Sequence, residues 1–189
     1  MRTLFSIFAV MFSSIIFAQE KVEIEDRINA EEVPKEAILW FRDAYEDATR
    51  VRWYIEKNQD SKSYEAKLKW KGQKHSVEFS ETGTIEDIEV LISWERLSTS
   101  TREALQEYFS SHYEKYRIRK IQRQWIGESD DLEDAIEEGE FEEVETRYEI
   151  EFYGRTSSQK ELWEGLFDID GHLIQRRIIK LRPTQNLIY

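Results

Sequence analysis

The feature that most constrains the fold is a pattern that occurs twice, in which one helical stripe is followed by four segments of alternating apolar and polar residues. In the first half, apolar residues recur at helical spacing over residues 34–47. In the second half, Ser100 to Glu103 has the spacing of a capping box at the start of a helix. Alternation with a period of two is typical of strands that bury one face. The predicted strands are residues 51–55, 64–70, 75–79 and 88–92 in the first half, and 116–126, 144–153, 162–168 and 172–181 in the second.

Local similarity between the two halves indicates a duplication. The stretch from Phe79 to Ile85 matches the stretch from Phe167 to Leu173, including a turn glycine at the same place. We therefore predict an α+β protein of two tandem units, each with one helix packed on a four-stranded antiparallel sheet. The first unit spans residues 19–97 and the second spans residues 98–189.

An acidic segment at residues 128–145 is the main difference between the halves. It holds eleven acidic residues and no basic one, which is typical of a solvated loop insertion. The segment lacks the glycine-punctuated ligand spacing of a preorganised calcium loop. We therefore expect weak association with divalent cations at most, and no tight metal site.

The N-terminal residues have the pattern of an export signal. Arg2 precedes an apolar run that ends at Phe17, and Ala18 follows as a small residue suited to cleavage. The run is shorter than the roughly 20 apolar residues that a membrane span needs. Residues 1–18 are therefore predicted to be a signal peptide, with no membrane insertion after its removal, and the mature protein is expected in the periplasm or outside the cell.

Composition excludes several classes of function. Asp and Glu number 39 against 27 Lys and Arg, so the net charge of −12 opposes binding to a nucleic-acid backbone. The chain has no Cys, which excludes thiol catalysis, thiolate metal sites and disulfides. Hydrophobic residues make up 40% of the chain, which is enough to form a folded core from packing alone.

Strand alternation separates a core face from a helix-free face. Trp53 shares its face with Val51 and Ile55, so we expect it to pack against the first helix. The same reasoning gives a predicted core of Ile38, Phe41, Trp53, Leu68, Val77, Phe79, Leu105, Phe109, Ile150 and Phe167. The opposite face carries a mixture of charges in the first half.

Two tryptophans in the second half are less clearly core residues. Trp125 shares a face with Ile121 and Arg123, and Trp163 lies on a strand with apolar residues on both faces. Such a strand is either covered on both sides or part of an interaction surface. With the charged face of the first half, this gives the predicted partner-binding residues Arg52, Tyr54, Lys67, Lys69, Trp125 and Trp163.

A family resemblance rests on the first unit. The run from Val33 to Phe41 with Tyr45, then Val51 to Trp53, Tyr64 to Ala66, and Phe79 with Gly83, resembles the PepSY-like family, also described as beta-lactamase-inhibitor-like. The resemblance implies an exported bacterial protein with tandem helix-plus-four-strand units. By analogy with the inhibitor proteins, it also implies a concave sheet that binds another protein. The second half departs from the pattern, since it lacks the proline at its helix start.

No motif in the chain carries a catalytic signature. The three histidines, His75, His112 and His172, lack the spacing of a helical zinc site, and we expect the first two in partly buried positions. The segment from Asp168 to Gly171 fails the ligand spacing of a calcium loop and is predicted to be a turn. We therefore expect no enzyme, no cofactor and no metal centre.

The predicted function is that of an exported, non-catalytic binding module, inhibitor-like in fold. It would recognise a protein or peptide, of unknown identity, through the helix-free face of the sheet. Two alternatives remain open. One is a cation-binding periplasmic protein that uses the acidic segment, and the other is a small hydrolase that uses a pair of carboxylates.

Overall fold

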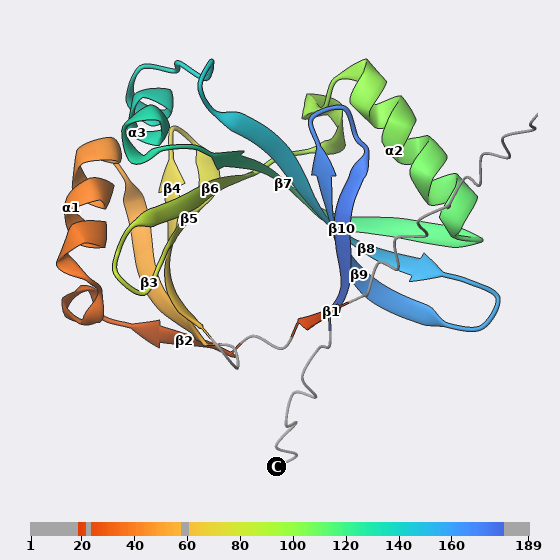
Figure 1. Ribbon diagram of the computed structural model, residues 1–189, viewed down its shortest axis with the longest axis horizontal. Helices are drawn as coiled ribbons and strands as arrows, with labels where there is room; N and C mark the ends of the chain where they lie inside the picture. The colour runs from red at the N-terminus through yellow and green to blue at the C-terminus, as the bar shows by residue number, and fades with distance from the viewer. Residues whose placement is uncertain (1–18, 22–23, 58–60, 180–189) are drawn as a thin grey trace, which may run out of the picture.

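Ten strands form one continuous sheet in the computed structural model, which describes residues 19–21, 24–57 and 61–179 (Figure 1). The predicted signal peptide, residues 1–18, lies outside the described residues. The strand order is β1-β10-β9-β8-β7-β6-β5-β4-β3-β2. The strands are β1 (Gln19–Lys21), β2 (Ile24–Ile28), β3 (Thr49–Lys57), β4 (Lys62–Trp70), β5 (Gln73–Phe79), β6 (Ile85–Leu91), β7 (Lys115–Ile126), β8 (Glu145–Arg155), β9 (Lys160–Asp168) and β10 (Leu173–Ile179). The helices are α1 (Lys35–Ala44), α2 (Thr99–His112) and α3 (Ser129–Glu137), with short 3-10 turns η1 (Ala30–Glu32) and η2 (Trp94–Arg96).

The prediction of two tandem units, each with one helix on its own four-stranded sheet, is wrong. Strands β6 and β7 pair directly across the expected boundary, with Ile88 opposite Trp125 and Glu89 opposite Gln124. Nine consecutive strands, β2 to β10, are thereby joined in one antiparallel sheet. Two separate sheets would have left β6 and β7 as edges with unpaired backbone groups, and their pairing removes both edges.

The acidic segment is not a solvated loop, because its first part forms α3. Leu132, Ala135 and Ile136 follow helical spacing and are buried, while the acidic side chains occupy the other side of the helix. These three residues belong to the same core cluster as α1 and strands β3 to β6. The Trp40 indole also donates a hydrogen bond of 3.2 Å to the Ser129 carbonyl oxygen. A helix from the second half of the chain therefore covers the sheet of the first half.

The core consists of two clusters that lie on the same face of the sheet. One is built from α1, α3, strands β3 to β6 and Trp125 of β7, and the other from α2 and strands β7 to β10. Ile121 and Trp125 share one face of β7 but belong to different clusters. Nine of the ten predicted core residues are buried, and Ile38 is half-buried against the first cluster. The prediction of the core is confirmed.

Turn glycines fix the start of both long helices against the sheet. Gly83 and Gly171 have φ of +93° and +91°, a region that favours glycine. A Cβ on Gly83 would lie 2.8 Å from a Pro34 side-chain atom, and one on Gly171 would lie 2.9 Å from the Thr101 carbonyl oxygen. Helix α2 is capped by Ser98, whose hydroxyl accepts a 3.0 Å hydrogen bond from the Thr101 amide, so the cap precedes the predicted one.

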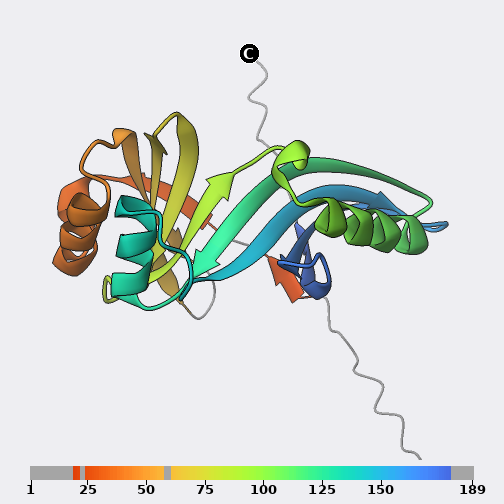
Figure 2. The same cartoon turned by 90° about the horizontal axis from the view of Figure 1, so that it is seen from above.

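The two ends of the sheet come close together. Strand β1 pairs in parallel with β10, whereas β2 pairs with β3 at the opposite end of the strand order. Residues 22–23 are all that separates Lys21 from Ile24, so three Cα–Cα steps hold these residues within about 11 Å of each other. The sheet therefore curls into a ring, with its helix-free face inside and the helices outside (Figures 1 and 2). None of the helices in the described part of the chain has the length and apolar composition of a membrane span.

Candidate functional site

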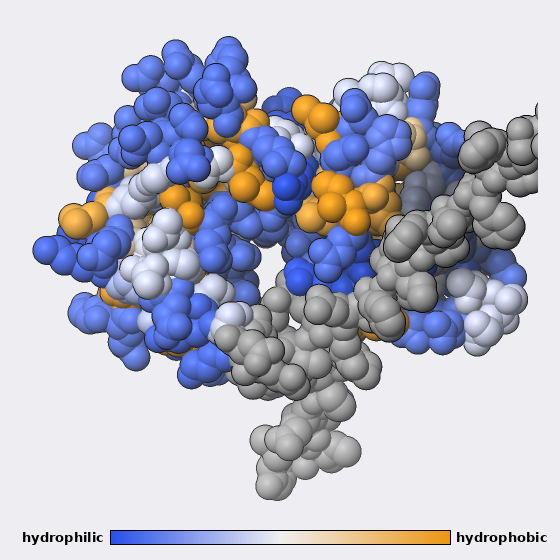
Figure 3. Space-filling view, viewed as in Figure 1, coloured by the Kyte–Doolittle hydropathy of each residue, from blue (hydrophilic) through white to orange (hydrophobic). Residues whose placement is uncertain are grey.

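The inner face of the sheet is a polar cleft. Strand alternation directs the apolar side chains to the helices and leaves charged and amide side chains inside the ring. The cleft has a volume of about 940 Å³ and is lined by residues from β2 to β10. The opening of the ring is bordered largely by hydrophilic residues (Figure 3).

Five glutamates of this inner face are buried, with 5% to 9% of each residue exposed. Buried carboxylates are uncommon unless a cation or hydrogen-bond donors accompany them. They form a row across the sheet, because each lies on the inner side of its strand. The five are Glu65 on β4, Glu89 on β6, Glu149 and Glu151 on β8, and Glu164 on β9.

At one end of this row, Lys67 compensates the charge of Glu65. Its ammonium lies 3.0 Å from carboxylate oxygens of both Glu25 and Glu65, and 4.9 Å from the ring centre of Tyr54. The Ser76 hydroxyl donates a further hydrogen bond to Glu65. Burial of Lys67 opposes its charge, but the two carboxylates outweigh this and raise its pKa above the ordinary value. Lys67 therefore stays charged at all physiological pH values.

At the other end of the row, three cations accompany the buried glutamates of β8 and β9, and one of them, Arg119, lies 2.9 Å from Glu151. The Lys120 ammonium lies 2.6 Å from Glu151 and 3.7 Å from Glu149. Arg177 forms an ion pair with Glu164 and lies 3.9 Å from Glu149. Burial opposes the charge of Lys120, yet the neighbouring carboxylates raise its pKa. The flanks of the inner face are thus built as compensated ion pairs.

The centre of the row differs, because Glu89 forms no ion pair with any of the described residues. It accepts a hydrogen bond from the Gln122 side-chain amide. Burial raises the pKa of Glu89 well above the ordinary range, and the negative charges of Glu149, Asp87 and Glu78 raise it further. The protein therefore favours a neutral Glu89 in the absence of an added cation.

Two amide oxygens next to Glu89 lack donors. The Gln124 amide donates a 2.8 Å hydrogen bond to Asp87, and the Gln122 amide donates to Glu89. The Oε1 atoms of Gln122 and Gln124 are buried, and no donor within the described residues reaches them. Only 8% of Gln122 is exposed. The centre of the inner face is therefore rich in acceptors and poor in donors.

The predicted partner-binding residues fall into two groups. Arg52, Tyr54, Lys67 and Lys69 line the cleft on the inner face. The two tryptophans lie on the helix side of the sheet and are 9% exposed, so the structure does not bring them together with the other four. Trp125 packs on Phe141 with ring centres 4.7 Å apart, and the Arg176 guanidinium lies 5.1 Å from the Trp163 ring.

Sequence reasoning missed the central residues of the face. Glu89, Gln122 and Gln124 occupy alternate positions on β6 and β7, so their side chains point the same way as Arg52 and Lys67. The alternation of these residues with apolar neighbours is visible in the sequence and could have placed them on the inner face. The sequence does not show, however, that β6 pairs with β7 and so brings them together.

Among the described residues, neither the histidines nor Asp168 belong to a group of three potential metal ligands. His75 is buried against Tyr45, whose hydroxyl lies 3.1 Å from its Nδ1, and burial lowers the pKa of His75 to about 4. His112 is exposed and stacks on Tyr108, which corrects the expected partly buried position. Asp168 accepts hydrogen bonds from the amides of Asp170 and His172, as a structural turn does.

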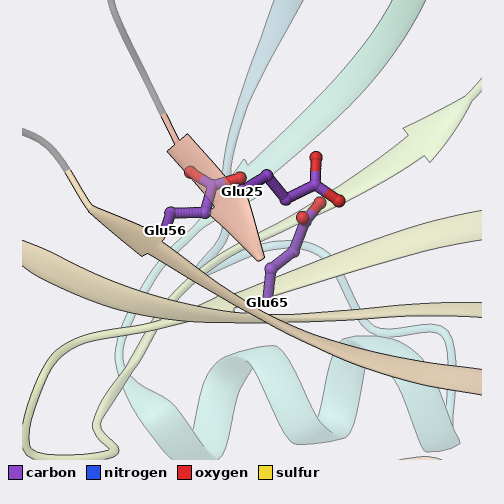
Figure 4. Close-up of side chains that lie close together, drawn as sticks. All are labelled: Glu25, Glu56 and Glu65. Carbon is purple, nitrogen blue, oxygen red and sulfur yellow. The ribbon is translucent and has the colours of Figure 1, made fainter. Parts of the chain in front are cut away.

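One cluster of carboxylates has the proximity that a cation site would need. Oxygen atoms of Glu25, Glu56 and Glu65 lie within 4.8 Å of one another, and the side chains of Glu25 and Glu65 converge (Figure 4). Calcium prefers 6 to 8 oxygen ligands, which is more than three carboxylates supply with one oxygen each. Lys67 already sits 3.0 Å from two of the three glutamates and contributes a positive charge there. The arrangement is therefore best explained as an ion-pair network.

Comparison with known proteins shows a shared fold. No protein-family model and no curated protein matches the chain. A DUF2874 family protein from Bacteroides ovatus has 18% identity and a TM-score of 0.53, covering 77% of this chain and 87% of its own. A Bacteroides eggerthii protein, provisionally named periplasmic, has 14% identity and a TM-score of 0.52, covering 77% and 88%. A BLIP-like protein from Bacteroides fragilis has 16% identity and a TM-score of 0.50, covering 80% and 91%.

These likenesses establish the architecture and no more. Identities of 14% to 18% are too low to transfer a function. The chain has a BLIP-like fold, as its resemblance to beta-lactamase-inhibitor-like proteins implied.

Proposed function

We propose that this chain is an exported, non-catalytic protein that binds another protein or a peptide through the inner face of its sheet. The observation that carries the proposal is the cleft of about 940 Å³ on a helix-free, concave face whose flanks are preorganised by ion pairs between half-buried lysines and buried glutamates. Ion pairs held in fixed geometry give a surface electrostatic specificity for a partner. Arg52, Tyr54, Lys67 and Lys69 form the basic part of this surface.

The similar structures support the proposal at a coarser level. The Bacteroides fragilis protein is named BLIP-like, and the Bacteroides eggerthii protein carries a provisional periplasmic name. Both descriptions agree with a periplasmic binding protein. Membership in the PepSY-like family, and removal of residues 1–18 during export, are parts of the same proposal.

One observation favours the hydrolase alternative. Glu89 is a buried carboxyl in a cleft with a raised pKa, which is a property of general acids. The neighbouring carboxylates and burial explain that pKa without a catalytic role. If a hydrolytic activity is found, its loss in a Glu89→Gln variant would support catalysis over binding.

Retention of a partner by matched variants tests the proposed function. The mature protein is immobilised and exposed to periplasmic extract of its native cell, and the retained proteins are identified by mass spectrometry. The face variant Arg52→Glu/Lys69→Glu reverses two exposed charges in the cleft. The control variant Lys35→Glu/Arg42→Glu makes the same change on exposed positions of α1.

We expect one protein to be retained by the wild type and the control, and at least tenfold less of it by the face variant. Equal retention by all three proteins would show that the inner face is not the binding surface. Equal loss from both variants would show a general effect of charge, which contradicts the proposal as well.

A further inference from the structure

We propose that the centre of the inner face binds one basic side chain of the partner, an arginine or lysine, through Glu89 and the amide oxygens of Gln122 and Gln124. This inference rests on the proposed function and specifies the chemistry of the partner. It commits to a polypeptide that presents a cationic side chain into the cleft.

The centre of the inner face differs from its flanks in charge compensation. Each of the other four buried glutamates has a lysine or arginine of the chain within 4 Å, as described for Lys67, Lys120 and Arg177. Glu89 is as buried as they are and forms no ion pair in the described part of the protein. Ionised Glu89 is costly without a cation, which is why the unbound protein favours the protonated form, and an incoming cation would stabilise the ionised form. The charge that complements ionised Glu89 is therefore positive.

Two hydrogen-bond acceptors at the same place lack donors. Gln122 and Gln124 use their amide donors on Glu89 and Asp87. Their Oε1 atoms accept nothing from the described residues, although buried acceptors are nearly always satisfied. The ligand must therefore bring donors.

A guanidinium or ammonium group meets both requirements. Guanidinium carries a positive charge and five N–H donors with no acceptor, and ammonium carries three donors. A divalent cation fits less well, because the one group of three convergent carboxylates among the described residues is Glu25, Glu56 and Glu65, which does not include Glu89. A cleft of about 940 Å³ also has room for backbone on either side of such a side chain.

Binding of a cation should also change the ionisation of Glu89. The groups that face Glu89 are Glu78 on β5, Asp87 on β6, Lys120 on β7 and Glu149 on β8, of which three are acidic. In the unbound protein these acids favour protonated Glu89. A bound cation favours the ionised form, so binding releases a proton and strengthens as the pH rises through the pKa of Glu89.

An NMR titration with two matched peptides tests the inference. The probes are acetyl-Gly-Arg-Gly-amide and the same peptide with citrulline, a neutral isostere, in place of arginine. They are added at up to millimolar concentration to the mature full-length chain while the side-chain amide signals of Gln122 and Gln124 are recorded. The variants are Glu89→Gln and the control Glu103→Gln, which changes an exposed position on α2.

We expect the arginine peptide to shift both amide signals saturably, and the citrulline peptide to bind at least tenfold more weakly. The Glu89→Gln variant should lose at least tenfold in affinity for the arginine peptide, and the Glu103→Gln variant should match the wild type. Equal binding of the two peptides, no saturable shift with arginine, or full affinity of Glu89→Gln would each overturn the inference. A Glu89-dependent shift caused by calcium chloride alone, without a response to arginine, would assign the site to a divalent cation instead.

The outcome can be separated from that of the proposed function. If the native partner is lost from the Arg52→Glu/Lys69→Glu variant but retained in full by Glu89→Gln, the inner face binds the partner and the central cation site is wrong. If neither variant loses the partner, the inner face is not the binding surface and the proposed function itself is contradicted.

Discussion

Glu89 should make the stability of the protein depend on pH. Its pKa is raised in the folded state by burial and by neighbouring acids, so the folded protein binds a proton more tightly than the unfolded chain does. Stability should therefore fall as the pH rises from the unfolded pKa toward the folded one. The variant Glu89→Gln removes this loss. We expect a higher Tm than the wild type at neutral pH, by about 2 to 4 °C for each ~1 kcal/mol gained, and a difference that shrinks near pH 4.

Thermal unfolding followed by circular dichroism at several pH values measures this effect. Glu103→Gln serves again as the control, since its side chain is exposed. A Glu89→Gln variant that is less stable than the wild type at neutral pH would mean that the ionised carboxylate has a compensating partner.

Gly171 gives a second prediction for a single residue. A Gly171→Ala variant combines a positive φ with a Cβ only 2.9 Å from the Thr101 carbonyl oxygen. Gly72→Ala has the matched backbone, φ of +86°, but no atom within 4 Å. We expect Gly72→Ala to cost about 1 kcal/mol of unfolding free energy, from the backbone alone, and Gly171→Ala clearly more. Urea denaturation measures both, and equal costs would show that the turn does not press on α2.

Helix α3 gives the prediction at the scale of one element. Leu132 is fully buried in the first core cluster, so Leu132→Ala should cost about 2 to 5 kcal/mol of unfolding free energy. Leu39→Ala removes the same side chain from α1, where 48% of it is exposed, and should cost less than about 1 kcal/mol. Chemical denaturation of the two variants decides the matter. A negligible cost for Leu132→Ala would contradict the burial of α3 and support the solvated loop that the composition of residues 128–145 predicted.

The sequence predicted helices and strands correctly wherever one local pattern of apolar residues dominated a segment. The eight long strands and helices α1 and α2 lie on the segments that alternation and helical spacing predicted. Helix α3 was missed because eleven acidic residues outweighed a short apolar spacing at Leu132, Ala135 and Ile136. Strand β2 is a short edge strand with three consecutive polar residues, so it lacks the alternation of apolar and polar residues that identified the longer strands.

Long-range pairing was beyond the reach of local patterns. The junction of β6 with β7 depends on which edges meet in space, and nothing in either strand specifies its neighbour. The same limit applies to the candidate site. Lys67 and Lys69 could be placed on the inner face from one hairpin, but the contact of Gln122 with Glu89 crosses 33 positions of sequence.

At the scale of the whole molecule, a designed cross-link tests the ring. Glu20 is opposite Ile178 in the parallel pairing of β1 with β10. Because the chain has no native Cys, the variant Glu20→Cys/Ile178→Cys should form a disulfide without competing thiols. Glu20→Cys/Ile174→Cys places the second thiol elsewhere on β10 and should stay reduced. Mass spectrometry after mild oxidation distinguishes the two, and a reduced first variant would contradict the pairing.

The pairing of β1 with β10 has a kinetic consequence. Backbone hydrogen bonds and the covalent link through residues 22–23 together make the chain an uninterrupted loop around its inner face. A polypeptide that passes through the ring from one opening to the other can then leave only by sliding out end first, or when the three residues of β1 separate from β10. A segment that enters from one opening can withdraw through the same opening. Long residence times that depend on the opening of the shortest strand would therefore indicate that a partner passes through the ring.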